Sequence, residues 1–362
     1  MRISAARTIA NQDLIFGDCV KAMAKMEVGS VDVAVTSPPY NLNLAYGSYD
    51  DAQEEPDYLN WLVKVCLAVK RMLKPDGSFF LNIAGSSSRP WLPFELIVRL
   101  REAFVLQNHI VWVKSIGIGS TSTGHFKPIA GRRFTHHNHE HVFHLTVDGR
   151  VDLDRLSIGV PFADKSNIAR RGHARDLRCR GNTWFIPYET VKSRAQKFRH
   201  PGTFPVELPL WCIYLHGKRR PVVLDPFVGS GTTLVAVHLA GGHGIGIDID
   251  PTYLSTAHDR VAAMAEGAIR TVLTVEEMQA LQGPEPQTGN DGGWQSLLVR
   301  LNNRLNRTTG EITLSAQELE KMRRYAFQHG NGAWHGHLIT VFGRSLGSDL
   351  GLRPQGSNPA AA

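Results

Sequence analysis

The residues best suited to chemistry follow a short apolar segment near the N-terminus. Residues 31–35 alternate as a buried strand does, and the chain continues Thr36-Ser37-Pro38-Pro39-Tyr40-Asn41. Two consecutive prolines fix φ and remove two backbone donors, so neither a helix nor a strand can continue. The loop therefore presents carbonyl groups, a hydroxyl and a flat ring, which can accept hydrogen bonds from an amino group and stack on a planar molecule. A Pro-Pro turn with a packed tyrosine is the alternative, and the loop alone leaves both open.

A second candidate site is a glycine-rich segment far downstream. A continuous apolar strand over residues 221–224 is followed by Asp225-Pro226-Phe227-Val228-Gly229-Ser230-Gly231-Thr232-Thr233, which begins a helix. The glycines allow close approach of a ligand to a helix N-terminus, where free N–H groups point outward. The next predicted strand ends in Asp248, whose carboxylate can bind the hydroxyls of a ribose. Because the segment lacks the P-loop lysine and the Gly-x-Gly-x-x-Gly of dinucleotide-binding proteins, it predicts a nucleoside-containing cofactor.

The elements that position these loops alternate between strand and helix up to about residue 113. This pattern predicts a parallel sheet, and ligands of such sheets bind at the carboxyl ends of the strands. Asp18 follows the first predicted strand and is a third candidate for ligand contact. An N-cap role for the helix that starts there is equally consistent with the sequence.

Between the two motifs, regular periodicity is lost over residues 114–195 and the chain becomes basic. A loop-built basic surface favours contact with the phosphates and base edges of a nucleic acid, although a solvated charged face is the alternative. The candidate nucleic-acid contacts are Arg170, Arg171, Arg175 and Arg178.

The same region contains His136-His137-Asn138-His139-Glu140-His141, which invites a metal-binding interpretation. On a strand, however, His139 and His141 share a face while Glu140 lies on the other. No cysteine or carboxylate nearby completes a defined set of ligands. We therefore predict no metal site and a sheet strand over residues 140–145.

Composition limits the class of protein. The 362 residues carry a net charge of +7 with a pI near 9.3, which favours a polyanionic partner. Four cysteines without paired spacing predict reduced thiols, as in the cytoplasm. No apolar stretch is long enough to span a membrane, and the first residues lack the core of a signal peptide.

Together, the two motifs resemble those of the amino-directed DNA methyltransferases that use S-adenosyl-L-methionine. The four-residue catalytic loop of that family is matched by residues 37–40, and its cofactor loop by residues 225–233. The order of catalytic motif, basic region and cofactor motif resembles the beta arrangement of the family. In that arrangement a His-Pro-x-x-Phe-Pro segment precedes the cofactor loop, and here it is His200-Pro201-Gly202-Thr203-Phe204-Pro205. The resemblance covers roughly residues 12–265.

The resemblance implies an α/β, Rossmann-like fold with a mostly parallel seven-stranded sheet and an inserted target recognition region. A small C-terminal module is expected outside the part that the resemblance covers. The expected segments are a catalytic half at 12–113, the target recognition region at 114–195, a cofactor-binding half at 196–268, a linker at 269–293, an accessory module at 294–345 and a disordered tail at 346–362. Within the accessory module, residues 337–342 are interpreted as a strand.

The resemblance also assigns roles to residues. The catalytic residues it implies are Ser37, Pro38, Pro39 and Tyr40. The cofactor-binding residues it implies are Asp18, Phe204, Asp225, Phe227, Gly229, Gly231, Thr232, Thr233 and Asp248. A base flipped out of the duplex would donate its amino hydrogens to the Ser37 hydroxyl and the Pro38 carbonyl and would stack on Tyr40.

The first residue of the catalytic loop bears on the target base. Serine there resembles the N4-cytosine enzymes, whereas aspartate is the usual N6-adenine form, so cytosine is favoured and adenine is the alternative. A non-catalytic DNA-binding protein on the same scaffold is a third interpretation. The expected partners are double-stranded DNA and a potential restriction endonuclease, for a monomer or homodimer in the cytoplasm of a bacterium or archaeon, or one encoded by a phage.

Overall fold

The computed structural model describes residues 6–44, 48–124, 132–170, 172, 175–187, 204–282, 294–324 and 333–347. The chain divides into two compact units, Met1–Ala263 and Met264–Ala362. The first unit contains both sequence motifs. Among the described residues, no helix combines the length and the hydropathy that crossing a bilayer requires.

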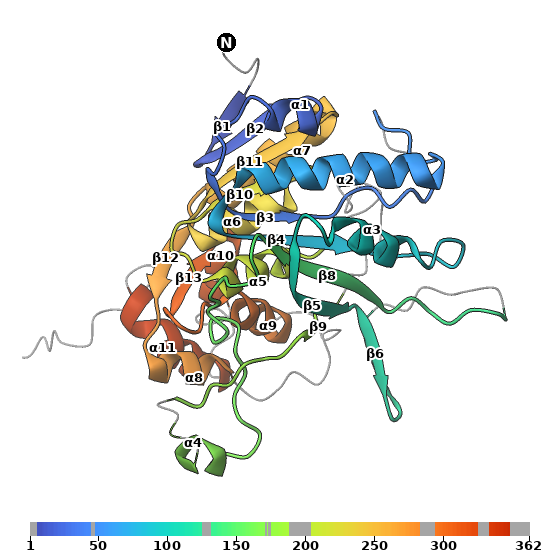
Figure 1. Ribbon diagram of the computed structural model, residues 1–362. Coiled ribbons are helices and arrows are strands. Elements are labelled where there is room, and N and C mark those ends of the chain that lie inside the picture. The colour runs from blue at the N-terminus through green and yellow to red at the C-terminus, as the bar shows by residue number, and fades with distance from the viewer. Residues whose placement is uncertain are drawn as a thin grey trace, which may run out of the picture. The chain divides into compact units, whose positions relative to one another are not determined.

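The first unit is built on a nine-stranded sheet in the order β1-β2-β11-β10-β3-β4-β8-β5-β9 (Figure 1). Its strands are β1 (Ala6–Ile9), β2 (Gln12–Phe16), β3 (Val31–Thr36), β4 (Leu73–Ile83), β5 (Val105–Val113), β8 (His139–Thr146), β9 (Thr183–Phe185), β10 (Val222–Asp225) and β11 (His243–Asp248). The strands from β2 to β4 run parallel, and β8 is antiparallel to both of its neighbours. The predicted α/β fold with a mostly parallel sheet is confirmed.

Two edge strands extend the expected seven-stranded sheet to nine. β1 folds back on β2 because Ala10 and Asn11 both have positive φ, 46° and 63°, which makes a tight hairpin turn between Ile9 and Gln12. β9 pairs in parallel with β5 at the other edge. Both strands are short, and neither stands beside the strands that carry the two motifs.

Helices cover both faces of the sheet. On one face lie α1 (Cys19–Met23), α2 (Glu55–Met72) and α3 (Leu92–Leu100), which share a buried core with side chains of β3, β4 and β8. Along α2, Tyr58, Leu62, Val65 and Val69 recur at helical spacing and are almost fully buried. On the other face, α5 (Glu207–His216) and α6 (Thr232–Ala240) pack against β3, β10 and β11. The long α7 (Pro251–Ala265) follows β11.

The basic region, residues 114–195, supplies irregular segments, a hairpin, a short helix and the sheet strands β8 and β9. A hairpin of β6 (Ser115–Ile118) and β7 (Thr121–Gly124) forms its own two-stranded sheet. β8 covers the strand that the sequence predicted at 140–145, and α4 (Ser166–Arg170) is a single short helix. The insertion thus contributes β8 to the interior of the large sheet and β9 to its edge.

The second unit corrects two sequence-based expectations. Its elements are β12 (Ile269–Val272), α8 (Val275–Gln282), α9 (Trp294–Arg304), β13 (Glu311–Leu314), α10 (Ala316–Arg323) and α11 (Ala333–Leu346). The linker expected at 269–293 is wrong for its first part, because residues 269–282 form β12 and α8, and Leu273 between them and Met278 and Leu281 of α8 belong to the core of this unit. The strand expected at 337–342 is part of α11, whose Leu338, Val341 and Phe342 have the i, i+3, i+4 spacing of a buried helical face.

The remaining C-terminal expectations fall largely outside the described residues. Residues 283–293, the second part of the expected linker, are not among them. The tail expected from residue 346 overlaps the last residue of α11, and residues 348–362 lie outside the described part of the chain.

A buried polar cluster connects the sheet to α5. Ser78 Oγ lies 3.0 Å from both His144 Nε2 and His216 Nδ1. The Asn108 amide donates to His144 Nδ1 at 3.0 Å, which leaves the His144 proton on Nε2 and the ring neutral. Burial lowers the pKa of His144 to about 3. Between about pH 3 and pH 6.5, His144 is therefore neutral in the folded protein but protonated in the unfolded chain.

We predict that this cluster makes the protein sensitive to acid. Since the folded pKa of His144 lies below the unfolded value of about 6.5, stability is lost as pH falls below about 6.5. The substitution His144→Gln keeps a polar side chain but cannot titrate. Urea unfolding between pH 6 and 4 should show a shallower loss of stability in the variant, by up to about 1.4 kcal/mol per pH unit. Equal slopes in the two proteins would contradict the assignment.

Candidate active site

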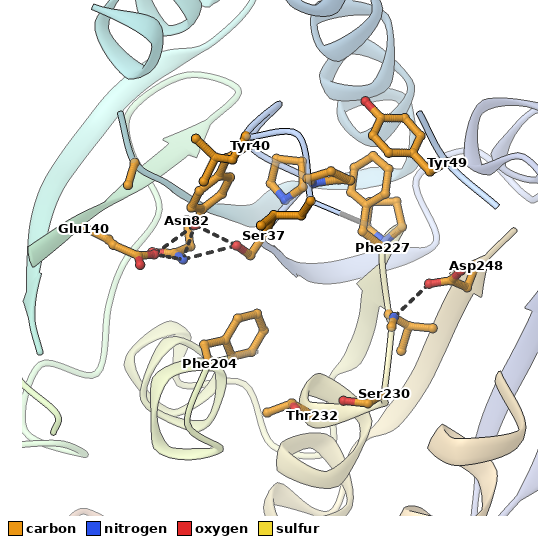
Figure 2. A pocket seen from close by; sticks show the side chains of 18 of the residues that line it. Ser37, Tyr40, Tyr49, Asn82, Glu140, Phe204, Phe227, Ser230, Thr232 and Asp248 are labelled. Carbon is orange, nitrogen blue, oxygen red and sulfur yellow. Dashed lines mark hydrogen bonds between the residues drawn. The ribbon is translucent and has the colours of Figure 1, made fainter. Parts of the chain in front are cut away.

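A cavity of about 860 Å³ opens at the carboxyl ends of the parallel strands and is shown in Figure 2. Ten of the predicted site residues line it: Asp18, Ser37, Pro38, Pro39, Tyr40, Phe204, Phe227, Gly229, Thr232 and Asp248. Asp225, Gly231 and Thr233 lie behind the wall and support it. Two loops separated by nearly 190 residues in sequence thus form one site, because β3 and β10 are adjacent and parallel.

Asp225 joins the two loops directly. Its carboxylate accepts hydrogen bonds from the Thr36 hydroxyl at 2.6 Å and from the Thr233 hydroxyl at 2.5 Å. The backbone N–H of Phe227 donates to the same carboxylate at 3.0 Å. Burial raises the pKa of Asp225 to about 6, although the three hydrogen bonds oppose this shift. The side chain is therefore a structural connector rather than a ligand-facing group.

At one end of the cavity, Ser37 belongs to a network of four polar side chains (Figure 2). Its Oγ lies 2.8 Å from the Tyr40 hydroxyl, which donates to Glu140 Oε2 at 2.8 Å. Asn82 Nδ2 lies 2.7 Å from the Tyr40 hydroxyl, 2.8 Å from Glu140 Oε2 and 3.2 Å from Ser37 Oγ, and its two hydrogens can serve two of these acceptors at once. Lys114 forms an ion pair with Glu140 at 3.0 Å.

The Glu140 carboxylate sets the direction of hydrogen bonding in this network. A carboxylate only accepts, so the Tyr40 hydroxyl donates its single proton to Glu140 and its oxygen accepts from Ser37. With its proton directed to Tyr40, Ser37 Oγ offers lone pairs to other donors, and Asn82 can occupy only one of them. Burial and the Glu140 charge raise the pKa of Tyr40 well above its ordinary value, so the phenol stays protonated. Ser37 is thus prepared as a hydrogen-bond acceptor.

The backbone of the Pro-Pro loop is held from behind. The Tyr58 hydroxyl of α2 donates to the Pro39 carbonyl at 2.6 Å. Asn41, which has a positive φ of 56°, binds Gln53 through both its amide oxygen and its amide nitrogen. The chain on both sides of Tyr40 is therefore fixed by residues from α2 and the segment that precedes it.

At the other end of the cavity, Asp248 faces the glycine loop. It accepts hydrogen bonds from the N–H groups of Gly229 at 2.9 Å and Asp250 at 2.8 Å. Burial raises the pKa of Asp248 to about 6. Because this value is still below 7, the carboxylate is mostly charged at neutral pH. A charged carboxylate at the end of β11 can accept hydrogen bonds from the hydroxyls of a ribose.

Close packing determines the path of the glycine loop. Gly231 has φ +82°, and a Cβ atom there would lie 2.7 Å from the Cβ of Ala257 on α7. From the same helix, Arg260 donates to the Ser230 carbonyl at 2.6 Å and to the Thr232 hydroxyl at 3.1 Å. The loop therefore rests on α7, and only glycine fits at position 231.

Aromatic rings form the wall between the two ends of the cavity. Phe227 contacts Trp61 of α2 with ring centroids 5.5 Å apart, and Trp61 contacts Tyr49 at 5.4 Å. Phe204 lines the cavity as well. Such a wall suits a ligand with a planar ring and an apolar portion.

Asp18 satisfies both of its sequence-based interpretations. Its side chain accepts a hydrogen bond from the Lys21 N–H at 2.9 Å and caps α1, and it also lines the cavity.

The predicted nucleic-acid contacts are not part of the cavity wall. Arg170, Arg175 and Arg178 are exposed, and Arg171 lies outside the described residues. In the described part of the chain, no group of three or more potential ligands could hold a metal ion.

Sequence reasoning missed Asn82, Lys114 and Glu140. Asn82 is a polar residue near the end of the apolar strand β4, which is a recognisable signal in hindsight. In the sequence, Glu140 is distinguished only by its place opposite the histidines, and that opposite face is the one that meets Tyr40. Lys114 follows the last residue of β5 and reaches Glu140 because β5 and β8 pair.

Comparison with known proteins agrees with this geometry. Residues 31–259, well over half of the chain, match a family model described as N6/N4 DNA methylase. The chain belongs to this family. The type II methyltransferase M.HpaI of Haemophilus parainfluenzae is 28% identical over 261 residues, which cover 71% of this chain and 76% of that protein. M.ScaI of Streptomyces caespitosus is 25% identical over 265 residues, covering 70% and 82%.

The fold is likewise shared with a solved structure. The PvuII DNA methyltransferase, named as cytosine-N4-specific, superposes with a TM-score of 0.53 at 21% identity, over 69% of this chain and 86% of that chain. This N6/N4 DNA methylase is thus a DNA methyltransferase on an α/β fold, and the methyl donor of its family is S-adenosyl-L-methionine.

For the network around Ser37, we predict that Glu140→Gln slows catalysis without weakening cofactor binding. A glutamine amide can donate to Tyr40, which would reverse the direction of hydrogen bonding and occupy the acceptor on Ser37. The turnover number should fall roughly tenfold or more, while calorimetry should give unchanged S-adenosylmethionine affinity. Glu102→Gln, an exposed change outside the cavity, is the matched control. Full turnover in Glu140→Gln would contradict the role of this carboxylate.

For the glycine loop, we predict that Gly231→Ala weakens cofactor binding at least roughly tenfold, because the added methyl group must displace the loop or α7. Calorimetric titration with S-adenosylmethionine measures the effect. Gly172→Ala is the control for a positive-φ glycine outside the cavity wall, since Gly172 has φ +64° and an added methyl group there would meet no other group within 4 Å. A normal affinity in Gly231→Ala would show that the loop adapts.

Proposed function

We propose that this DNA methyltransferase transfers a methyl group to the exocyclic N4 amino group of cytosine in double-stranded DNA. The observation that carries the proposal is the residue at position 37. A neutral serine hydroxyl, directed by the Tyr40–Glu140 pair, stands where the N6-adenine enzymes usually have an aspartate. The alternative is N6-adenine methylation by the same site, and a non-catalytic DNA-binding role is a more distant third.

The residues of the cavity fit the methyl donor. We assign the ribose to Asp248, the close backbone approach to Gly229, and the aromatic and apolar contacts to Phe227 and Phe204. Asp18 and Thr232 complete this end of the wall, with Asp225, Gly231 and Thr233 as supports. When bound, S-adenosylmethionine supplies an electrophilic methyl group carried on a sulfonium.

The chain's own part in the reaction is to hold and activate an amino group. The lone pair of a base amine is delocalised into the ring, which makes the amine a poor nucleophile. When Ser37 Oγ and the Pro38 carbonyl accept hydrogen bonds from the two N–H groups, they favour a pyramidal nitrogen with a localised lone pair. Positioning and hydrogen bonding of this kind supply much of the rate enhancement of an enzyme. No covalent intermediate with the protein is needed.

The target base must leave the duplex to reach this end of the cavity. We assign stacking on the flipped base to the Tyr40 ring, whose hydroxyl is anchored to Glu140. The basic segment at 114–195 is the proposed target recognition region, with Arg170, Arg171, Arg175 and Arg178 as contacts to DNA. A restriction endonuclease that cuts the same sequence is the proposed cellular partner.

We predict that DNA from cells expressing the protein contains N4-methylcytosine, and that Ser37→Ala removes it. Mass spectrometry of the digested DNA identifies the base, and single-molecule sequencing gives its context. Because Ser37 contacts the amino group, the variant should lose roughly a hundredfold or more of its activity while calorimetry shows normal cofactor affinity. N6-methyladenine would overturn the base assignment, and full activity in Ser37→Ala would overturn the mechanism.

A further inference from the structure

The β6–β7 hairpin is an element that the proposed reaction leaves without a role. Ser115–Ile118 pairs with Thr121–Gly124, and Gly119 at φ +59° begins a two-residue turn. The hairpin pairs with no strand of the large sheet and extends away from it, as Figure 1 shows at the label β6. A two-stranded hairpin gains little stability by itself in water. A hairpin that projects from the protein therefore indicates a role in binding rather than in folding.

One face of this hairpin is apolar and exposed. Ile116 and Ile118 are two residues apart on a strand, so they share a face. They are 38% and 70% exposed, and the value for Ile118 is the highest of any large apolar side chain in the described residues. Because Ile118 closes the turn opposite Thr121, it stands at the far end of the hairpin.

The base of the hairpin is fixed to the active-site network. Lys114, the residue before β6, binds Glu140 through its ammonium group, and its backbone N–H donates to the Asn138 carbonyl at 2.7 Å. Ser115 is 2% exposed, and a Cβ atom at Gly124 would lie 2.4 Å from the Lys114 carbonyl oxygen. The two strands therefore leave the protein as a tightly packed pair, directly beside the residues that hold Tyr40.

The charge around the hairpin suits a polyanion. No aspartate or glutamate occurs between Glu102 and Glu140 in the sequence, whereas the exposed Arg132 and Arg133 lie in this stretch. An apolar tip on a stem free of acidic residues can approach a phosphate backbone without repulsion.

We propose that the hairpin enters the DNA duplex at the target site and that Ile118 wedges into the base stack beside the flipped base. This inference rests on the proposed function, which requires the base to leave the stack. Extrusion leaves a gap between neighbouring base pairs, and apolar side chains that occupy such gaps compensate for lost stacking. Isoleucine has no side-chain hydrogen-bonding group, so the wedge acts on any base sequence, while recognition is left to other residues.

The test compares Ile118→Ala with the wild-type enzyme on two duplexes that contain the methylation site found by sequencing. In one the target base is paired, and in the other it faces an abasic site and needs no extrusion from a pair. For the paired duplex, kcat/KM and DNA affinity by fluorescence anisotropy should both fall roughly tenfold. For the abasic duplex both should stay within about twofold of wild type.

Three matched variants sharpen the comparison. Ser122→Ala changes the opposite face of the same hairpin, since Ser122 pairs with Gly117. Val98→Ala removes a comparably exposed apolar side chain, 60% exposed, from α3. Both should behave as wild type, and Ile118→Leu should restore most of the loss seen with alanine.

The outcomes separate this inference from the proposed function. Equal losses of Ile118→Ala on both duplexes, or no loss on either, would overturn the wedge. A change of oligomeric state by light scattering without a change in DNA affinity would assign the apolar face to a second copy of the chain and would also overturn it. Failure of the wild-type enzyme to methylate either duplex would count against the proposed function, while the ratio of the two binding affinities would still decide the role of Ile118.

Discussion

The active site depends on one buried carboxylate. Asp225 accepts from Thr36, which immediately precedes the catalytic loop, and from Thr233 and Phe227 on either side of the glycine loop. Burying a carboxylate is costly, and the raised pKa shows that the cost is only partly offset by its three donors. In return, the carboxylate fixes the position of one loop relative to the other. The proposed catalytic loop and the proposed cofactor loop are fixed to the same two oxygen atoms.

This connection brings together two motifs that lie far apart along the chain. β3 and β10 are neighbours and parallel, so their carboxyl ends meet wherever the connecting segments run. Nearly 190 residues separate Thr36 from Asp225 in sequence, and yet they are in direct contact. The intervening basic region is free to form irregular structure, because the sheet and not the connection brings the loops together.

The sequence predicted the features that are local. Ser37, Gly229 and Asp248 stand at strand ends in recognisable patterns, and ten of the thirteen residues named from motifs line one cavity. Asn82 has a local signal as a polar residue near the end of an apolar strand, but Lys114 and Glu140 have none, because they meet Tyr40 and Asn82 only through the pairing of β4, β8 and β5. The C-terminal errors have a different origin. There the periodicity of Leu338, Val341 and Phe342 was helical, but the segment was short enough to be interpreted as a strand.

The antiparallel direction of β8 has a consequence for how such an enzyme can diversify. β8 is antiparallel to β4 and β5, so it begins at the end of the sheet where these two strands finish. Lys114, after β5, and Glu140, near the start of β8, are therefore the two ends of one connecting segment. The ion pair between them joins the two ends of this segment and closes it into a loop. Lengthening a closed loop costs free energy only logarithmically. The segment between these two residues can therefore be replaced or lengthened while the hydrogen-bond network around Ser37 and Tyr40 is kept.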